Sequence, residues 1–302
     1  MTRHTEIEPV DPKRYLVLVC PERIAKPFVK AAHYSHTFPS ARLCVGAWEV
    51  WSPEGKAMQP QFWSARAMEQ HAAWAASNKD ALQGLHPLER AHALRGVVVF
   101  SVGVQPRAIT RWLGVEPRLG VELGRAVWAD WGETPSNAMS WLIRQALRVC
   151  ERALPEVLGV LTYADPDVRS NKVGHVGSIY QSLGFTYKGP AASRRILMFN
   201  NPGDGDEILN ERVLAKIRQQ HVGHLSAQER LAQRGLPRMA PGEDPAVYVQ
   251  RVVEDGLRSG VLRRGRTGGL HVYTWALHGQ KQAPGLPYPK QTKETGMKDG
   301  NA

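Results

Sequence analysis

Short apolar runs alternate with segments of helical periodicity along the first two thirds of this chain. Apolar runs of about four to eight residues, bounded by Gly or Pro, indicate strands. They predict strands at residues 14–21, 42–51, 96–104, 121–128, 157–164, 185–187 and 194–200. Apolar residues three and four positions apart predict helices at residues 22–32, 108–113, 141–152 and 178–183. This order of elements is typical of an α/β (α+β) protein.

The pattern changes after residue 200. Helical periodicity predicts helices at residues 207–220, 226–234 and 247–259, and a basic loop at 263–269 and a strand at 270–277 follow. The expected organisation is a main domain at 1–200 with an insertion at about 52–95, a helical, basic elaboration at 201–269, a final strand at 270–278 that rejoins the sheet, and a disordered polar tail at 279–302.

Composition narrows the class of protein. The chain has 302 residues, 42% of them hydrophobic, and no apolar run approaches the roughly 20 residues that a membrane span needs. Cys20, Cys44 and Cys150 lack metal-ligand spacing, which indicates reduced cysteines in a cytoplasmic protein. The net charge of +11 favours a nucleic acid as partner, DNA or RNA, although solubility alone would also explain it.

One strand–loop–helix unit carries the first candidate site. Asp165 follows the predicted strand 157–164, His175 lies between glycines, and Tyr180 lies on the predicted helix 178–183. Ligands of α/β sheets tend to bind beyond the carboxyl ends of strands, which is where these side chains would meet. The structural alternatives are that Asp165 caps a loop and that Tyr180 packs in the core.

His33-Tyr34, at the end of the predicted helix 22–32, is the second candidate. His33 could cap the helix while Tyr34 packs its ring, or the pair could belong to a functional site. His33 and His36 lie three residues apart. With Asp165 or His175 they would make a set of two histidines and one carboxylate, which suits iron.

Two resemblances meet in these segments. Ile179–Phe185, followed by Gly189, resembles the closing helix and strand of the GNAT acyltransferase superfamily. Tyr163-Ala164-Asp165 with Gly174–Gln181 is similar to the phage DNA-modification proteins of the Mom type, as is His33-Tyr34 before a Pro-Ser turn. The resemblance implies a GNAT-like fold, with a central, mostly antiparallel sheet flanked by helices and interrupted by helical insertions.

The resemblance also implies roles for individual residues. It makes His33, Tyr34, Asp165 and Tyr180 the catalytic candidates. It makes Glu122, Arg125, Ser136, Asn137, Ser140, Gly174, His175 and Gly177 candidates for binding a substrate or cofactor.

Two of these segments resemble parts of the acyl-donor site of GNAT proteins. Glu122-Leu-Gly-Arg125 is similar to a strand of Mom proteins, and the corresponding strand of GNAT proteins splays away from its neighbour. Glu122 and Arg125 are three residues apart, so one could face the site and the other the opposite side of the sheet. Either residue could instead form a structural salt link. Pro135-Ser136-Asn137 precedes a helix whose start binds coenzyme A pyrophosphate in GNAT proteins. The glycine-rich loop of GNAT proteins is missing here, which counts against coenzyme A.

The leading hypothesis is a transferase that hypermodifies adenine in double-stranded DNA, by carbamoylmethylation at N6, and so protects phage DNA from restriction. The alternatives are an acyl-coenzyme A N-acyltransferase and an inert nucleic-acid-binding protein. Arg263, Arg264 and Arg266 would contact DNA. The group donor stays open between an acyl-CoA-like molecule and chemistry with iron at His33 and Asp165. We expect a cytoplasmic protein of a phage-infected or prophage-carrying bacterium; its oligomeric state is open, with a homodimer as one option.

Overall fold

The computed structural model describes residues 8–49, 93–103, 105–129, 134–166, 174–200 and 207–290. The chain divides into two compact units. Unit 1 comprises residues 1–163, 177–189 and 272–288, and unit 2 comprises residues 164–176, 190–271 and 289–302. The insertion expected at about 52–95 lies outside the described residues, except for its last three, which belong to a strand.

Unit 1 is built on a sheet of seven described strands. These are β1 (Tyr15–Val19), β2 (Ala41–Glu49), β3 (Ala93–Ser101), β4 (Gly120–Trp128), β5 (Gly159–Ala164), β6 (Thr186–Pro190) and β10 (His271–Ala276). Its described helices are α1 (Glu22–Ala32), α5 (Pro106–Leu113), α6 (Ala138–Ala153) and α7 (Ser178–Leu183), with single 3-10 turns at Pro12–Arg14 and Pro117–Leu119.

The strands lie in the order β1-β2-β3-β4-β5-β10-β6. The pairs β1–β2, β2–β3 and β3–β4 are antiparallel, whereas β4–β5 is parallel. This confirms the prediction of a mixed α/β protein with a mostly antiparallel central sheet. It also confirms that the strands predicted at 96–104, 121–128 and 157–164 share a sheet. Strand β10 lies between β5 and β6 in the same sheet.

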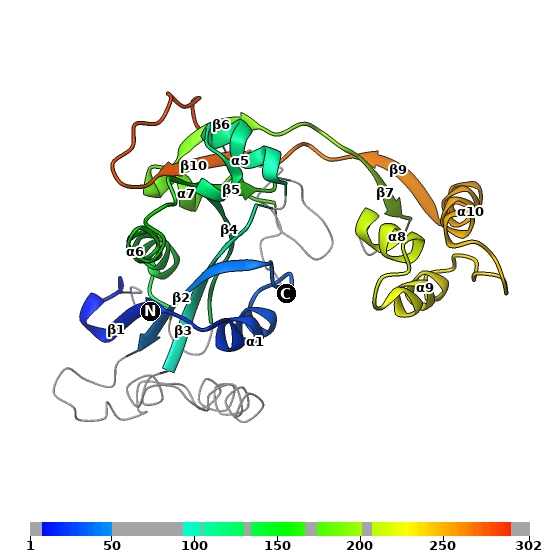
Figure 1. The fold of residues 1–302 in the computed structure, drawn as a ribbon, viewed down its shortest axis with the longest axis horizontal. Helices are drawn as coiled ribbons and strands as arrows, with labels where there is room; N and C mark the ends of the chain where they lie inside the picture. Colours follow the sequence, from blue (N-terminus) through cyan, green and yellow to red (C-terminus); the bar gives the residue numbers. More distant parts are fainter. Residues whose placement is uncertain are drawn as a thin grey trace, which may run out of the picture. The chain divides into compact units, whose positions relative to one another are not determined.

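Helices α1 and α6 cover opposite faces of this sheet. Apolar residues of α1, among them Phe28, form one buried cluster with Val97 and Val99 of β3. Gly96 points the other way and lies under Leu142 of α6, whose Cδ2 would be 2.6 Å from a Cβ at that glycine. Because successive strand residues face opposite sides, the two helices sandwich the sheet, as Figure 1 shows around β2 and β3.

Residues 279–290, expected to belong to a disordered tail, instead lie along β6. Leu286 donates its backbone N–H to the carbonyl of Tyr187 at 2.8 Å. The Tyr288 hydroxyl donates to the carbonyl of Phe185 at 2.8 Å. Polar composition favoured disorder, but backbone groups at the open edge of the sheet supply hydrogen-bond partners that composition does not reveal. Residues 291–302 lie outside the described residues.

Unit 2 holds a second, smaller sheet and three described helices. The sheet order is β8-β7-β9, with β7 (Arg195–Phe199), β8 (Glu207–Leu209) and β9 (Leu262–Arg266). The helices are α8 (Glu211–Arg218), α9 (His224–Gln233) and α10 (Pro245–Arg258). Their apolar faces and one end of the sheet share a buried core that includes Phe199, Leu231, Tyr248 and Leu262.

Three predictions for this part of the chain were wrong. Residues 207–209 form a strand rather than the first turn of a helix, because they pair with β7. Helix α9 begins at His224 after Gly223, so Ser226 is not its cap. The arginine-rich segment expected to be a loop forms β9, which is paired with β7 over five residues.

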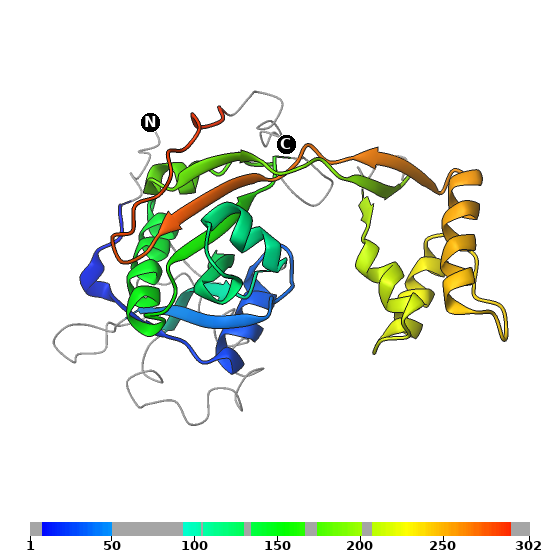
Figure 2. The same ribbon diagram turned by 45° about the horizontal axis from the view of Figure 1, so that its top comes forward.

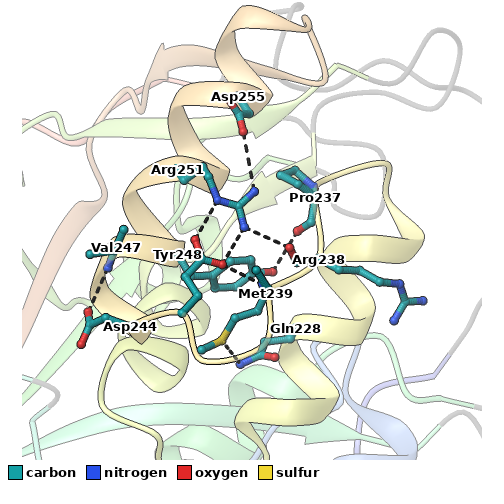
Figure 3. A network of polar contacts seen from close by, with 11 residues as sticks. Gln228, Pro237, Arg238, Met239, Asp244, Val247, Tyr248, Arg251 and Asp255 are labelled. Carbon is teal, nitrogen blue, oxygen red and sulfur yellow. Dashed lines mark hydrogen bonds and ion pairs between the residues drawn. The ribbon is translucent and has the colours of Figure 1, made fainter.

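A polar network fixes the connection between α9 and α10. The guanidinium of Arg251 donates to both carboxylate oxygens of Glu243, at 2.8 and 2.7 Å, and to the carbonyl of Arg238 at 3.0 Å. The Tyr248 hydroxyl donates to the carbonyl of Pro237 at 3.1 Å, and Asp244 caps α10 (Figure 3). These bonds, the charge-assisted ones of Arg251 above all, hold the loop between the two helices.

Candidate active site

The end of α1 turns His33 into the protein. The helix ends at Ala32, and His33 takes an extended backbone while its N–H still bonds Val29. The side chain is buried, with 8% exposed. Burial, together with the nearby charges of Arg125 and His36, lowers the pKa of His33 to about 4. The ring is therefore neutral near pH 7.

A chain of hydroxyl groups joins His33 to Arg125. His33 Nδ1 accepts the N–H of Ser35 at 3.1 Å and lies 2.9 Å from the Ser35 hydroxyl. That hydroxyl lies 3.1 Å from the Thr37 hydroxyl, which accepts Arg125 Nη2 at 2.6 Å. Since a guanidinium only donates, Thr37 can give its proton to Ser35 and Ser35 can give its own to Nδ1. These partners assign the neutral ring its proton on Nε2.

A β-bulge in β4 brings Arg125 to this position. Glu122 pairs with Ser101 and Arg125 pairs with Val99, with a register shift between them. Partners Ser101 and Val99 are two residues apart, so Glu122 and Arg125 lie on the same face of the sheet. The prediction that they face opposite sides was wrong, because the extra residue of the bulge reverses the alternation.

Tyr34 and Tyr180 are the two tyrosines among the catalytic candidates. Tyr34 is 60% exposed, and its ring lies 4.3 Å from that of His33. Tyr180 is buried on α7, in contact with the rings of Phe185 and Tyr273. Burial raises the pKa of Tyr180, and Tyr34 adds to the rise, so the two phenols are within electrostatic reach of each other.

Strands β4 and β5 part beside Tyr180. Their parallel pairing joins Gly120–Glu122 to Gly159–Leu161. At the next position the Thr162 hydroxyl donates to the carbonyl of Leu123 at 3.2 Å. Thr162 is also hydrogen-bonded to Tyr180, and because its proton is committed to Leu123, the Tyr180 hydroxyl is the donor. Thr162 thus connects the parting strands to the phenol.

The charge of Glu122 affects the pKa of a further tyrosine, Tyr163. Burial raises the pKa of Tyr163 to about 12, and the charge of Glu122 contributes. A half-buried carboxylate and a neutral phenol therefore lie close together where β4 and β5 part.

The start of α6 is already engaged by the N-terminal segment. Asn137 occupies the N-cap position but does not cap with its side chain. Its Oδ1 accepts the N–H of Val10 at 2.7 Å, and the N–H of Ser136 donates to the carbonyl of Glu8 at 3.2 Å. The Ser140 hydroxyl donates to the carbonyl of Asn137 at 3.0 Å. Among the backbone donors before the helix, the Ser136 N–H is thus engaged and is not left for a phosphate.

The loop after β5 is closed at its ends. The N–H of His175 donates to the carbonyl of Asp165 at 2.9 Å, and both side chains are half-buried beside the buried Gly174. Gly177 has a left-handed backbone, with φ of 81°, and starts α7. Asp165, Gly174 and His175 belong to unit 2, so the convergence of Asp165 with His33 and Tyr180 stays a prediction.

Comparison with known protein families shows which family the chain belongs to. Residues 14–238 match the Mom protein family, which is well over half of the chain. The chain belongs to the Mom protein family. No curated protein matches the chain in sequence. Membership implies a DNA-modifying activity of the Mom kind. The matched residues include His33, Tyr34, Glu122, Arg125 and Tyr180.

The family match ends within the connection between α9 and α10, so it leaves out β9 and β10. The aromatic strand β10 and the arginines 263, 264 and 266 therefore lie beyond the matched residues. These arginines are exposed on β9 rather than in a loop. Their role in binding DNA remains a proposal.

Sequence reasoning missed Ser35, Thr37 and Thr162. Thr37 and Thr162 bond partners far along the chain, whereas Ser35 bonds its near neighbours His33 and Thr37. A Ser-x-Thr spacing directly after His33-Tyr34 was the available signal.

Iron at His33 and Asp165 also stays a prediction. Within the described ranges no three His, Cys, Asp or Glu side chains are grouped as metal ligands. In addition, a ring whose Nδ1 accepts an N–H keeps its proton on Nε2, so binding a metal there would require the Ser35 turn to rearrange. As for membranes, none of the described helices has the length and apolar character that crossing a bilayer takes.

Proposed function

We propose that this Mom protein is a transferase that modifies adenine at N6 in double-stranded DNA, by carbamoylmethylation, at the site around His33, Tyr34 and Tyr180. The observation that carries the proposal is the family match together with a buried neutral histidine stacked on an exposed tyrosine. Such a product would shield phage DNA from restriction.

The exposed Tyr34 ring suits an extruded base. The exocyclic amine of adenine is inside the duplex, so the enzyme must act on a flipped or unpaired base. Tyr34 is 60% exposed and is held by its contact with His33, which gives a base a ring on which to stack. The His33 Nε2–H would then donate to an acceptor on the base or on the transferred group.

Asp165 and Tyr180 are assigned to proton transfer. When N6 forms a bond to carbon it loses one proton, and we assign Asp165 as the base that accepts it. The Tyr180 phenol is protonated near pH 7, as an acid that protonates a leaving group has to be. Its proton would turn from Thr162 to the leaving group in that step.

A GNAT-like acyl-coenzyme A acyltransferase is the second candidate. The parting of β4 and β5 after three residue pairs favours it, because GNAT proteins bind the acyl donor in such a slot. The engaged start of α6 and the missing glycine-rich loop count against it.

Mass spectrometry of nucleosides separates the candidates. DNA from cells that express the chain should contain a new carbamoylmethylated adenosine, and DNA from cells that express Asp165→Asn with Tyr180→Phe should lack it. Acetylated protein or amine products would favour the acyltransferase instead. Unmodified DNA in both strains would contradict the proposal.

A further inference from the structure

Strands β7 and β9 form a two-stranded ribbon at one end of the small sheet. Their five pairs run from Phe199–Leu262 to Arg195–Arg266, and beyond them Thr267 donates its N–H to Arg194 at 3.0 Å. Strand β8 pairs only with Leu197–Phe199. At the Arg195 end the sheet therefore consists of two strands, which lie side by side in Figure 2.

Arginines gather on one face of this end. Arg195 lies directly opposite Arg266, and Arg264 lies two residues before Arg266, so all three share a face. All three are exposed. Farther along the same face, Phe199 and Leu262 belong to the core that the helices cover. The face is apolar where the helices pack and cationic at the other end.

The ribbon arginines differ from other arginines of unit 2. Arg251 and Arg238 each donate two hydrogen bonds to a glutamate. Among the described residues, Arg195, Arg264 and Arg266 take part in no ion pair, although like charges directly opposite each other destabilise a strand pair. Their arrangement reduces the stability of the free ribbon, and an external anion would relieve that repulsion.

We propose that Arg195, Arg264 and Arg266 form a docking surface for the phosphate backbone of duplex DNA. Duplex DNA as the occupant rests on the proposed function. The planar guanidinium group binds phosphate through two parallel hydrogen bonds, and three such groups on a rigid ribbon match a row of phosphates better than a single anion. A two-stranded ribbon also fits the major groove of B-DNA.

The salt dependence of binding tests this surface. With the full chain and a fluorescent DNA duplex, the slope of log K against log salt should flatten by about 2.7 in the Arg195→Gln, Arg264→Gln, Arg266→Gln triple variant, since each lost phosphate contact removes about 0.9. The single variants should each flatten it by about 0.9, and they keep the test decisive if the triple variant unfolds early.

A matched variant separates the surface from net charge. Arg212, Arg218 and Arg230 are exposed on α8 and α9, so replacing all three with Gln removes the same charge elsewhere in unit 2. The ribbon triple should flatten the slope more than this control. Equal flattening in both, or none in the ribbon variants, would overturn the proposal, and so would tighter binding to an RNA duplex of the same length.

Nucleoside analysis tells the two proposals apart. Modified adenosine with an unchanged salt slope in the ribbon variants would leave the function standing and remove the docking surface. A flattened slope in the ribbon variants, with unmodified DNA from cells that express the wild-type chain, would leave the docking surface standing and contradict the proposed function.

Discussion

His33 combines two properties at the residue scale: burial keeps its ring neutral, and Ser35 fixes which nitrogen carries the proton. Neither property is visible in the sequence, where a histidine after a helix more often caps it or faces water. The charge of Arg125 reaches the ring both through space and through the Thr37 and Ser35 hydroxyls. The pKa of His33 therefore depends on a residue 92 positions away along the chain.

Replacing Arg125 should change the titration of His33. Arg125→Gln removes a positive charge that disfavours the protonated ring, so the pKa of His33 should rise from about 4. It should stay below 6.5, because burial is the larger cause. Histidine NMR signals followed against pH measure this. A pKa that stays at 4 or falls would show that Arg125 does not act on the ring.

Tyr180 and Asp165 can be tested by removing one group each. Tyr180→Phe removes only the hydroxyl and should lower the rate of DNA modification by at least about 10²-fold if that group transfers a proton. A structural hydroxyl would instead cost about 1 kcal/mol of stability with little loss of rate. Asp165→Asn should abolish modification while the thermal midpoint stays nearly unchanged. Full activity in either variant removes that residue from the mechanism.

At the element scale, the bulge in β4 and the parting of β4 from β5 position residues of the candidate site. The bulge puts Glu122 and Arg125 on one face, and the parting leaves Thr162 to bond Leu123 and Tyr180. Both features arise where regular pairing stops, which is also where side chains rather than backbone groups have to satisfy the carbonyls.

Gly124 lies in the bulge, where Ser101 and Pro39 approach it closely. A Cβ there would lie 2.7 Å from the Ser101 hydroxyl oxygen and 3.2 Å from Pro39. Gly124→Ala should therefore destabilise the fold by about 1–3 kcal/mol, measured by chemical unfolding. Adding Ser101→Ala should recover part of the loss because it removes the nearest atom, and Ser101→Ala alone serves as the control. A fully stable Gly124→Ala protein would mean that the bulge can shift without cost.

At the scale of the whole molecule, the two compact units have buried clusters of their own. The cluster around α1 in unit 1 and the cluster under α8, α9 and α10 in unit 2 share no residue. The candidate catalytic residues His33, Tyr34 and Tyr180 belong to unit 1, and the arginine ribbon belongs to unit 2. Three of the four candidate catalytic residues would then lie in unit 1, whereas Asp165 and the arginine ribbon lie in unit 2.

Separate cores predict separate responses to mutation. Leu231 is 3% exposed in the core of unit 2, so Leu231→Ala should destabilise that unit by about 2–5 kcal/mol. Hydrogen exchange should rise in α8, α9 and α10 and stay unchanged in β3 and β4. Val222→Ala, at a position 97% exposed, is the control and should change neither. Equal loss of protection in β3 would indicate one cooperative unit.

Sequence by itself determined the elements that local interactions specify. Helices α1 and α7 begin and end at the predicted residues, because an apolar face at helical spacing and the bounding Pro21 and Gly184 act within one or two turns. Short, mainly apolar segments likewise predicted β4 and β5, and local motifs pointed to the Mom family before any contact was visible.

Tertiary structure decided everything that depends on a distant partner. Arg263–Arg266 resembles a loop because it lacks apolar alternation, yet β7 supplies the hydrogen bonds that make it a strand. The side of the sheet on which Arg125 lies depends on a bulge against β3. The hydroxyl chain that places the His33 proton on Nε2 begins at Arg125. Backbone pairing and burial act between residues that the chain separates widely, so no local pattern encodes them.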